Sequence, residues 1–556
     1  MSTSLHPSSK EVPKADALGP THYKDWPNDA GFNAETEQRT PIPLPITGTI
    51  PAYAAGTLFR TGPGSHKLTT KDGEFACSHW FDGFAHLYRF ELIVTPAGDC
   101  KVVYSSRRQV DKLIERVRKT GRLDGITFGQ KRDPCDTFFQ KIKSTFEPSL
   151  GREPGLMNVG VSISANVAGI PSSMTDKSTV KTGNLVSFTD ASIMKTHDPE
   201  TLAPLGVTDQ TMLHRSLSGP LSSAHPEFDP QTGDVYNYNL AFGPTPTYRI
   251  FCTSAATGKT SILATLSGKD AKVAYIHSFF ITENFLVLCI WPAHFAAGGA
   301  KVLWTRNLLD ALADFDPSAK TKWIIIDRRH SNGVVAKFES HAMFAFHTVN
   351  AYEEVGKDGR VDIVCDLVQH RTVDILKRFY YESMVSTSPG AAKGRLGMAD
   401  GMDGMARYKL SGIPSGGKPV TKEMGKAEEI FIMSPTLSGE LPTINPAYTT
   451  KKHHYVYGLC DRRQSSFLDG IVKMDMETQT SVLWSKKGHT PGEPIFVADP
   501  EKAGEDDGVV LSAVLDGETG HSYLLVLDAK SWVEVGRAEV PVAVGFGFHG
   551  AHVKGL

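Results

Sequence analysis

The amino-acid sequence predicts an all-β protein built as a β-propeller, on two observations. Short apolar strands separated by turn residues begin near Gly56 and continue to the C-terminus. A recurring unit also runs along the chain, in which two strands flank a turn that contains an aspartate and a threonine or serine; it occurs at 196–202, 228–238, 474–484 and 525–535. Each unit predicts a β-hairpin with a polar turn. A repeated hairpin in a chain of 556 residues favours a propeller, with a large β-sandwich as the alternative.

The first 45 residues differ from the rest of the chain in composition, because they are polar and rich in proline. They predict an N-terminal arm that is partly disordered or wraps the surface, and residues 46–556 predict a single propeller domain. Helical spacing of apolar residues at 112–117 and 307–315 predicts two helices among the strands.

Charge and cysteine usage limit the partners and the compartment. The net charge is −2 and no long basic block is present, so a nucleic-acid partner is not expected. The seven cysteines are scattered, without a CxxC pair, which is typical of a reducing compartment. The sequence has no apolar signal core and no run long enough for a transmembrane helix. We therefore expect a cytoplasmic protein whose membrane attachment, if any, is peripheral.

The segment 133–146 has helical spacing with an apolar face. Two lysines flank that face, which consists of Phe138, Phe139, Ile142 and Phe146. One interpretation is a helix packed on the core. The other is an amphipathic patch on a membrane or lipid-droplet surface, where an apolar substrate could enter.

Four isolated histidines, His225, His277, His347 and His549, lie at the ends of apolar or aromatic segments far apart in the sequence. Such surroundings favour neutral imidazole, which is the form that binds metals. Each histidine alone is also typical of a satisfied core residue, and none has the spacing of a zinc finger or an HExxH helix. Because the inner strands of a propeller converge on its axis, we expect the four side chains to meet at one metal ion.

Nearby residues add to this hypothesis. Gly545, Gly547 and Gly550 leave no side-chain bulk around His549, so backbone or a ligand can approach it closely. Glu440 and Glu493 lie in weakly charged, proline-bounded segments. They are either solvated turn acids or acceptors for the second ring N–H of a ligating histidine. The acidic run 505–507 predicts an exposed loop.

Seven segments, in order, carry a resemblance to a known family. They are 56–64, 79–86 (HisTrpPheAspGlyPheAlaHis), 224–229 (AlaHisProGluPheAsp), 344–354, 492–500, 505–512 and 547–550 (GlyPheHisGly). The chain resembles the carotenoid cleavage oxygenases from about Pro41 to the C-terminus. Within the family, the sequence most resembles fungal members that cleave torulene or form retinal.

This resemblance implies a seven-bladed propeller, capped over the metal-bearing face by a helical and loop dome from insertions at about 110–160 and 300–320. It implies one Fe²⁺ per chain, held by the four histidines; the GlyPheHisGly pattern selects His549 over His552. The family's acids beyond the ligands map onto Glu440 and Glu493, and the third maps onto Asp190, where the family has glutamate. The shorter Asp190 is expected to reach its histidine through water or less tightly.

The reaction implied is oxidative cleavage of a carbon–carbon double bond by O₂ in a carotenoid or apocarotenoid, which yields aldehydes or ketones without an organic cofactor. A stilbene is the competing substrate: stilbene cleavers hold a phenol with a tyrosine and a lysine. Here Tyr104 could supply the tyrosine, but Thr189 stands where the lysine is expected. A non-catalytic binding propeller and a retinoid isomerase are further alternatives. The segment 133–146 is similar to the membrane-docking part of animal members, and a monomer is expected.

Overall fold

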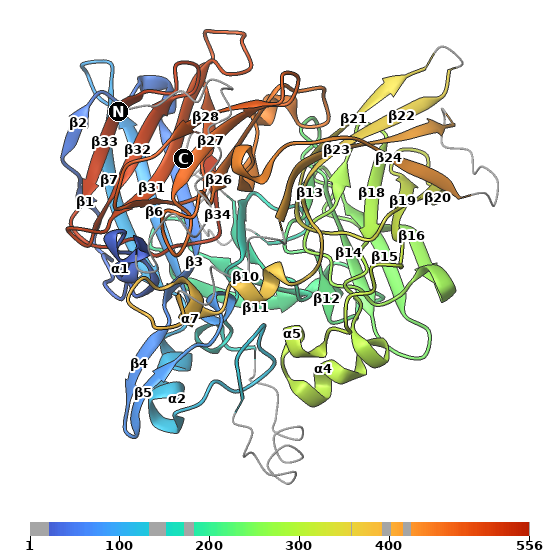
Figure 1. The fold of residues 1–556 in the computed structure, drawn as a ribbon, viewed down its shortest axis with the longest axis horizontal. Coiled ribbons are helices and arrows are strands. Elements are labelled where there is room, and N and C mark those ends of the chain that lie inside the picture. Colours follow the sequence, from blue (N-terminus) through green and yellow to red (C-terminus); the bar gives the residue numbers. More distant parts are fainter. Residues whose placement is uncertain are drawn as a thin grey trace.

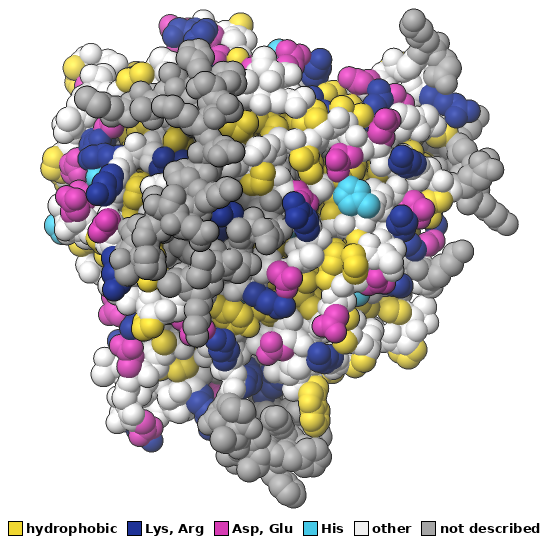
Figure 2. Space-filling view, viewed as in Figure 1, with side chains coloured by type: hydrophobic (Ala, Val, Ile, Leu, Met, Phe, Trp, Pro, Cys, Tyr) yellow, Lys and Arg dark blue, Asp and Glu magenta, His cyan; other side chains and the backbone are white. Residues whose placement is uncertain are grey.

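The computed structural model describes residues 22–132, 152–171, 183–356, 359–391, 402–414 and 424–554. The fold is all-β, and its sheets follow one another around the molecule in a propeller-like arrangement (Figure 1). Over the face shown in Figure 2, lysine and arginine side chains are interspersed with acidic ones among the described residues.

The described residues form six sheets of four to eight strands. The first contains β1 (Ile42–Pro43), β7 (Cys100–Arg108), β6 (Phe84–Val94), β3 (Gly56–Ser65) and β34 (His549–Val553). The second contains β11 (Pro204–Asp209), β10 (Ile193–His197), β9 (Leu185–Phe188) and β8 (Ser162–Ala165). The third contains β12 (Leu221–Ser222), β14 (Val235–Ala241), β15 (Thr247–Thr253) and β16 (Thr260–Ser267), with β13 (Glu227–Phe228) paired to β14.

The fourth sheet has eight strands: β17 (Phe280–Ile281), β18 (Phe285–Ile290), β19 (Thr321–Asp327), β20 (Val334–Ser340), β24 (Gly425–Ile432), β23 (Met402–Ile413), β22 (Val361–His370) and β21 (Phe344–Val355). The fifth contains β25 (Glu440–Thr443), β26 (Tyr455–Cys460), β27 (Gly470–Asp475) and β28 (Thr480–Trp484). The sixth contains β2 (Ile46–Gly48), β33 (Glu534–Val540), β32 (His521–Asp528), β31 (Gly508–Asp516) and β29 (His489–Pro491), with β30 (Ile495–Ala498) paired to β31. A separate hairpin consists of β4 (Lys67–Thr70) and β5 (Gly73–Ala76).

Seven separate blades, as the resemblance implied, are not found among these sheets. The eight-stranded sheet consists of two four-stranded antiparallel units that are joined where β20 and β24 run parallel. The two strands approach there because Gly425 lacks a side chain: a Cβ at this position would lie 2.5 Å from Cδ1 of Phe338. The all-β, propeller-like prediction is thus confirmed, but the predicted number of separate sheets is wrong.

Strands from near both ends of the chain complete the first and the last sheet. Strand β34, close to the C-terminus, pairs with β3 in the first sheet, and β2, close to the N-terminus, pairs with β33 in the last. Each of these sheets therefore depends on strands from opposite ends of the chain. The exchange also carries His549 into the first sheet.

All four hairpins expected from the repeat are present. They join β10 to β11, β13 to β14, β27 to β28 and β32 to β33. In each turn an aspartate carboxylate accepts backbone N–H groups two or three residues further on, as in an Asx turn; these residues are Asp198, Asp229, Asp475 and Asp528.

The two expected helical segments are found, although the second is short. Helix α2 (Asp111–Thr120) buries Leu113, Ile114 and Val117 and ends at Gly121, whose φ of 68° closes the last turn. Helices α4 (Ala300–Thr305) and α5 (Leu308–Ala311) occupy the second insertion. The other α-helices among the described residues are α1 (Asp29–Phe32), α6 (Ile375–Arg378) and α7 (Tyr381–Met384). None of the helices in the described ranges has the length and apolar character needed to cross a bilayer. Residues 133–146 lie outside the described residues.

Residues 26–34, within the predicted N-terminal arm, pack into the folded body, whereas most of 35–43 lies on the surface. The side chain of Asn28 is buried and donates to the carbonyl of Met384 and to the hydroxyl of Ser466. Phe32 in α1 is fully buried. This part of the arm therefore fastens the beginning of the chain to segments far along it.

The acidic run at 505–507 does not form an exposed loop. The carboxylate of Glu505 accepts the backbone N–H groups of His454 and Tyr455, and Asp506 pairs with Lys473 at 2.7 Å. Glu505 and Asp506 are each only 9% exposed. The prediction was wrong because these acids join the fifth sheet to the sixth, a role that local composition does not show.

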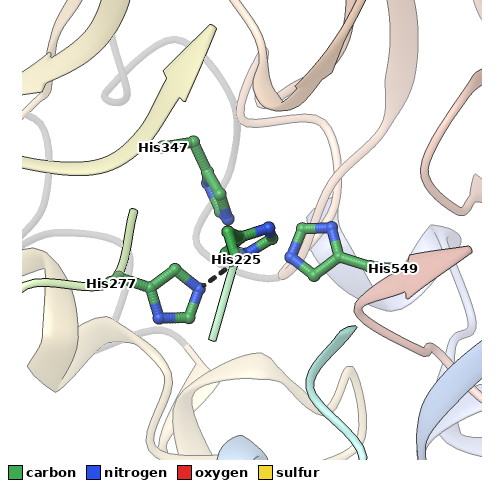
Figure 3. A group of neighbouring side chains, drawn as sticks. All are labelled: His225, His277, His347 and His549. Atoms are coloured by element: carbon green, nitrogen blue, oxygen red, sulfur yellow. Dashed lines mark hydrogen bonds between the residues drawn. The ribbon is translucent and has the colours of Figure 1, made fainter. Parts of the chain in front are cut away.

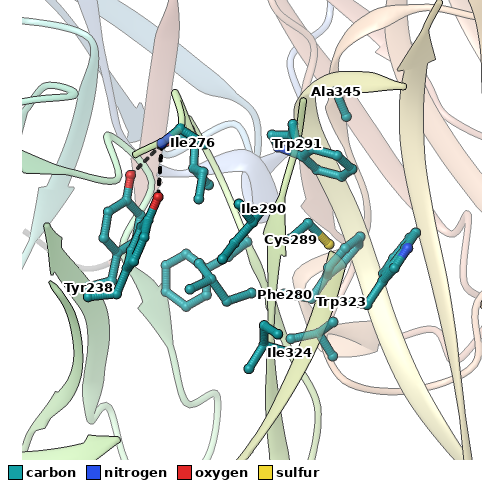
Figure 4. Close-up of a cluster of buried hydrophobic side chains, with 14 of the residues drawn as sticks. Tyr238, Ile276, Phe280, Cys289, Ile290, Trp291, Trp323, Ile324 and Ala345 are labelled. Atoms are coloured by element: carbon teal, nitrogen blue, oxygen red, sulfur yellow. Dashed lines mark hydrogen bonds between the residues drawn. The ribbon is translucent and has the colours of Figure 1, made fainter. Parts of the chain in front are cut away.

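A large apolar core supports the segments that carry two of the histidines. Phe280, Trp291 and Trp323 pack together between β17, β18 and β19, next to Ile276 and Ala345 (Figure 4). Burial of each large apolar side chain contributes about 1.5–3 kcal/mol. Ile276 precedes His277 and Ala345 lies just before His347, so this packing fixes the backbone on which both imidazoles stand.

Candidate metal centre

The four predicted histidines lie on or next to strands that end their sheets. His225 lies between β12 and β13, His277 just before β17, His347 within β21 and His549 at the start of β34. Strands β12, β17, β21 and β34 are each a terminal strand in the order of their sheet. This common position lets three sheets contribute to one point, the eight-stranded sheet through both of its end strands.

The structure brings the four imidazoles together (Figure 3). One ring nitrogen from each of His225, His277, His347 and His549 lies within 4.8 Å of those of the others. Nε2 of His225 and Nε2 of His277 are 3.1 Å apart. The convergence expected from the sequence is therefore present in the geometry.

A β-bulge directs His347 toward this point. The pairing of β21 with β22 shifts register between Ala345 and Thr348, so Phe346 and His347 have no partner in the ladder. The bulge is held by Ser278, whose hydroxyl donates to the carbonyl of Phe346 and accepts the N–H of Thr348. Because Ser278 follows His277, the positions of these two histidines are coupled.

The glycines around His549 allow two backbone segments to pack closely. A Cβ on Gly547 would lie 2.6 Å from the carbonyl oxygen of Thr61, and one on Gly550 would lie 2.7 Å from that of Phe59. Both contacts are with β3. Close approach of another strand thus accounts for glycine at these two positions, and it seats His549 firmly against the first sheet.

Three of the histidines contact the predicted acids through their second ring nitrogen. The pairs are His277–Asp190, His347–Glu440 and His549–Glu493, each with 2.7 Å between Nδ1 and a carboxylate oxygen. Asp190 makes this contact directly, so its expected water-bridged or looser contact was wrong. An ionised carboxylate can only accept, so Nδ1 carries the proton and Nε2 of each ring presents a lone pair to the common centre.

Each acid has a further partner that the sequence did not single out. The hydroxyl of Tyr275 donates to Asp190 over 2.9 Å, and Nε2 of His370 lies 2.6 Å from Glu440. The guanidinium of Arg60 donates to the backbone carbonyl of Glu493, 3.7 Å from its carboxylate. Of these three partners, only Arg60 lies in one of the segments that resemble the family, 56–64. These partners fix the orientation of the acids.

Burial and mutual contact shift the pKa values of Glu440 and of two of the histidines. Burial would raise the pKa of Glu440, but the contacts with His347 and His370 hold it well below its usual range. Burial lowers the pKa of His347 to about 4, against the opposing effect of Glu440. Burial, with the three neighbouring imidazoles, lowers the pKa of His225 well below its usual value. Both imidazoles are therefore neutral near pH 7, as metal binding requires.

The donor set fits a transition-metal ion. Nε2 of His347 is buried without any hydrogen-bond partner among the described residues. Nε2 of His277 faces Nε2 of His225 with an unprotonated lone pair, as its contact with Asp190 requires. Lone pairs directed at one point repel each other unless a cation lies between them. Imidazole suits iron, zinc and copper, so the ligands alone do not choose among these metals.

A cavity of about 780 Å³, which includes space open to solvent, adjoins the centre. His277, His347 and His549 form part of its wall. The rest is mostly apolar, with Trp80, Phe81, Val161, Phe346, Phe379 and Phe548 among the lining residues. Such a lining suits an apolar ligand. Tyr104 instead lies fully buried in β7, packed with Phe90, and is not among the residues described as lining this cavity.

Comparison with known proteins places the chain in a family. Residues 31–554 match the family model described as RPE65, retinal pigment epithelial membrane protein. The chain belongs to the RPE65 and carotenoid oxygenase family. This membership confirms the resemblance found in the sequence. The enzyme class, a carotenoid cleavage dioxygenase, is supported by relatives named carotenoid dioxygenase and torulene dioxygenase.

Relatives of known name match almost the whole chain. A carotenoid dioxygenase of Neurospora crassa is 43% identical, over 96% of this chain and 92% of its own length. A torulene dioxygenase of Gibberella fujikuroi is 42% identical, over 96% and 94%. Among solved structures, a variant of Synechocystis apocarotenoid oxygenase has a TM-score of 0.72 at 19% identity, over 97% of this chain and 99% of that one. This last likeness concerns the fold. The same oxygenase has also been solved in a cobalt-substituted form.

Proposed function

We propose that this protein uses one Fe²⁺ per chain and O₂ to cleave a carbon–carbon double bond of a carotenoid or apocarotenoid, giving aldehyde or ketone products. The observation that carries the proposal is the convergence of His225, His277, His347 and His549 on one point. The relatives named carotenoid dioxygenase and torulene dioxygenase support the substrate class.

A ferrous ion held by the four histidines would supply the activation of O₂ that oxidative cleavage needs. The chain's own residues prepare the centre for it. Asp190, Glu440 and Glu493 keep a proton on Nδ1 of their histidines and lock each ring in one orientation. These carboxylates also place negative charge behind the ligands, which favours a bound cation.

The apolar wall of the cavity gives the substrate its place. Phe346 and Phe548 adjoin His347 and His549 in sequence, so an apolar chain lying against them is next to the metal centre. They also exclude water from the reacting bond. A carotenoid is favoured over a stilbene because Thr189 replaces the expected lysine and Tyr104 is fully buried and not among the residues that line the cavity.

We propose peripheral contact with a membrane or lipid-droplet surface through 133–146 as the entry route of the substrate. Exposed apolar side chains near this segment support the proposed contact. Ile126, Leu303 and Trp304 are 54%, 60% and 58% exposed, although all three are apolar. The loop of Ile126 is joined to the end of α4 by hydrogen bonds from Thr127 to Arg306. A single domain at 46–556, with the insertions as a dome, a monomeric state and a cytoplasmic location remain part of the proposal.

The test is mass analysis of the products from β-carotene, torulene, an apocarotenal and resveratrol, offered in parallel to the iron-loaded protein. We expect aldehyde fragments from one or more of the polyenes, and O₂ consumption only when substrate is present. Cleavage of resveratrol alone would assign the protein to the stilbene branch. A protein that purifies without iron, cannot be loaded with it and leaves all four compounds intact would instead be a binding module.

A further inference from the structure

One ion pair interrupts the apolar wall of the cavity outside the metal centre. Arg378, the last residue of α6, pairs with Asp461, which follows β26. Both line the cavity, together with the neighbouring Phe379. Their side chains are only 14% and 11% exposed, so this charge pair lies where a largely apolar ligand would contact it.

The guanidinium has unused hydrogen-bond donors. Arginine carries five N–H groups. Within the described residues, Arg378 donates from Nη2 to Asp461, and its Nε and Nη1 have no acceptor. Asp461 is better satisfied, because its carboxylate also accepts the backbone N–H of Arg463 over 2.8 Å. What this site lacks is therefore an acceptor oxygen.

The nature of the missing acceptor follows from charge and solvation. A hydrocarbon pressed against Arg378 would strip water from its free N–H groups and return no hydrogen bond, which is unfavourable. A carboxylate would be repelled by the neighbouring Asp461. A carbonyl oxygen only accepts, carries no net charge and leaves the ion pair intact.

We propose that Arg378, held by Asp461, forms a subsite for the carbonyl oxygen of an apocarotenal, and that this contact sets how the polyene lies relative to the four histidines. The inference rests on the proposed function and deepens it, because it selects aldehyde-ended substrates over hydrocarbons. Sites that hydrogen-bond a substrate group reject the analogue that lacks the group, since the protein's polar atoms are then left unpaired.

The test is direct binding to the metal-free protein, which separates the subsite from catalysis. The probes are an apocarotenal and the hydrocarbon in which a methyl group replaces its aldehyde; quenching of tryptophan fluorescence reports occupancy, because Trp80 lines the cavity. We expect the aldehyde to bind about 10-fold to 100-fold more tightly, the range for a hydrogen bond to a charged group. Arg378→Met should remove most of this preference and leave the affinity for the hydrocarbon unchanged or higher.

Two further variants make the result decisive. Arg371→Met removes an arginine from the same segment, but Arg371 is exposed and pairs with Asp403 outside the cavity, so the preference should remain. The double variant Arg378→Met, Asp461→Leu replaces the whole pair by apolar groups, a change that buried ion pairs often tolerate. It should fold and show no preference. Equal binding of both probes to the wild type, or an unchanged preference in the folded double variant, would overturn the subsite. Neither outcome bears on whether the iron-loaded protein cleaves polyenes.

Discussion

Replacing Glu440 by glutamine tests how the metal centre is held. The two carboxylate oxygens of Glu440 contact different donors, Nδ1 of His347 at 2.7 Å and Nε2 of His370 at 2.6 Å. An amide of the same size keeps one acceptor and turns the other position into a donor that faces an N–H group. The substitution therefore removes one charge-assisted hydrogen bond, worth about 1.5–3 kcal/mol, without opening a cavity.

The expected consequence is a loss of metal affinity. His347 loses either its fixed tautomer or its orientation, and the removal of such a partner typically costs about 10-fold to 100-fold in affinity. Fe²⁺ binding is measured anaerobically by competition with a chromophoric chelator. Unfolding by urea, followed in the same samples, shows how much of the effect comes from stability.

The matched control is Glu477→Gln. Glu477 lies 3.3 Å from Nε2 of His454, but both side chains are nearly half exposed and neither is among the residues that line the cavity. Such a surface pair contributes at most about 1 kcal/mol. We expect no change in iron affinity for this variant. Iron affinity in Glu440→Gln equal to that of the wild type would show that the acid does not hold a ligand.

Three further predictions concern other parts of the molecule. His347→Ala should abolish cleavage and most iron binding but leave a folded protein, as circular dichroism would show; unchanged turnover would remove His347 from the site. Burial lowers the pKa of Lys195 to about 7, so the unfolded chain binds its proton more tightly, and stability relative to Lys195→Met should rise from pH 7 toward 10.5 by at most about 1.4 kcal/mol per pH unit. Urea midpoints at pH 7 and 9 measure this, and a flat difference would contradict it. Leu303→Ser with Trp304→Ser should weaken liposome binding but spare cleavage of detergent-dispersed substrate, and undiminished binding would exclude α4 from the docking surface.

The sequence predicted the parts of this protein that depend on local chemistry. An aspartate that caps its own turn makes a hairpin recognisable from a few residues, and all four such hairpins are present. Isolated histidines at strand ends were also visible, because polar residues are rare in such places. Their convergence followed from the geometry expected of the fold.

The features that were missed depend on contacts between distant segments. The parallel pairing of β20 with β24 joins strands about ninety residues apart, at a close approach that Gly425 allows. No local sequence pattern predicts this pairing. Tyr275 and His370 look like ordinary residues until the acids that they contact are placed beside them. The run at 505–507 looked solvated because its partners lie in another sheet.

Locating iron by anomalous scattering in crystals of the iron-loaded protein tests the central claim most directly. We expect one peak at the iron edge, about 2.1 Å from a ring nitrogen of each of His225, His277, His347 and His549, and its loss in His347→Ala crystals. The distance is that of a typical bond between a divalent metal and imidazole nitrogen. A peak elsewhere, or an ion held by fewer of these rings, would contradict the four-histidine centre.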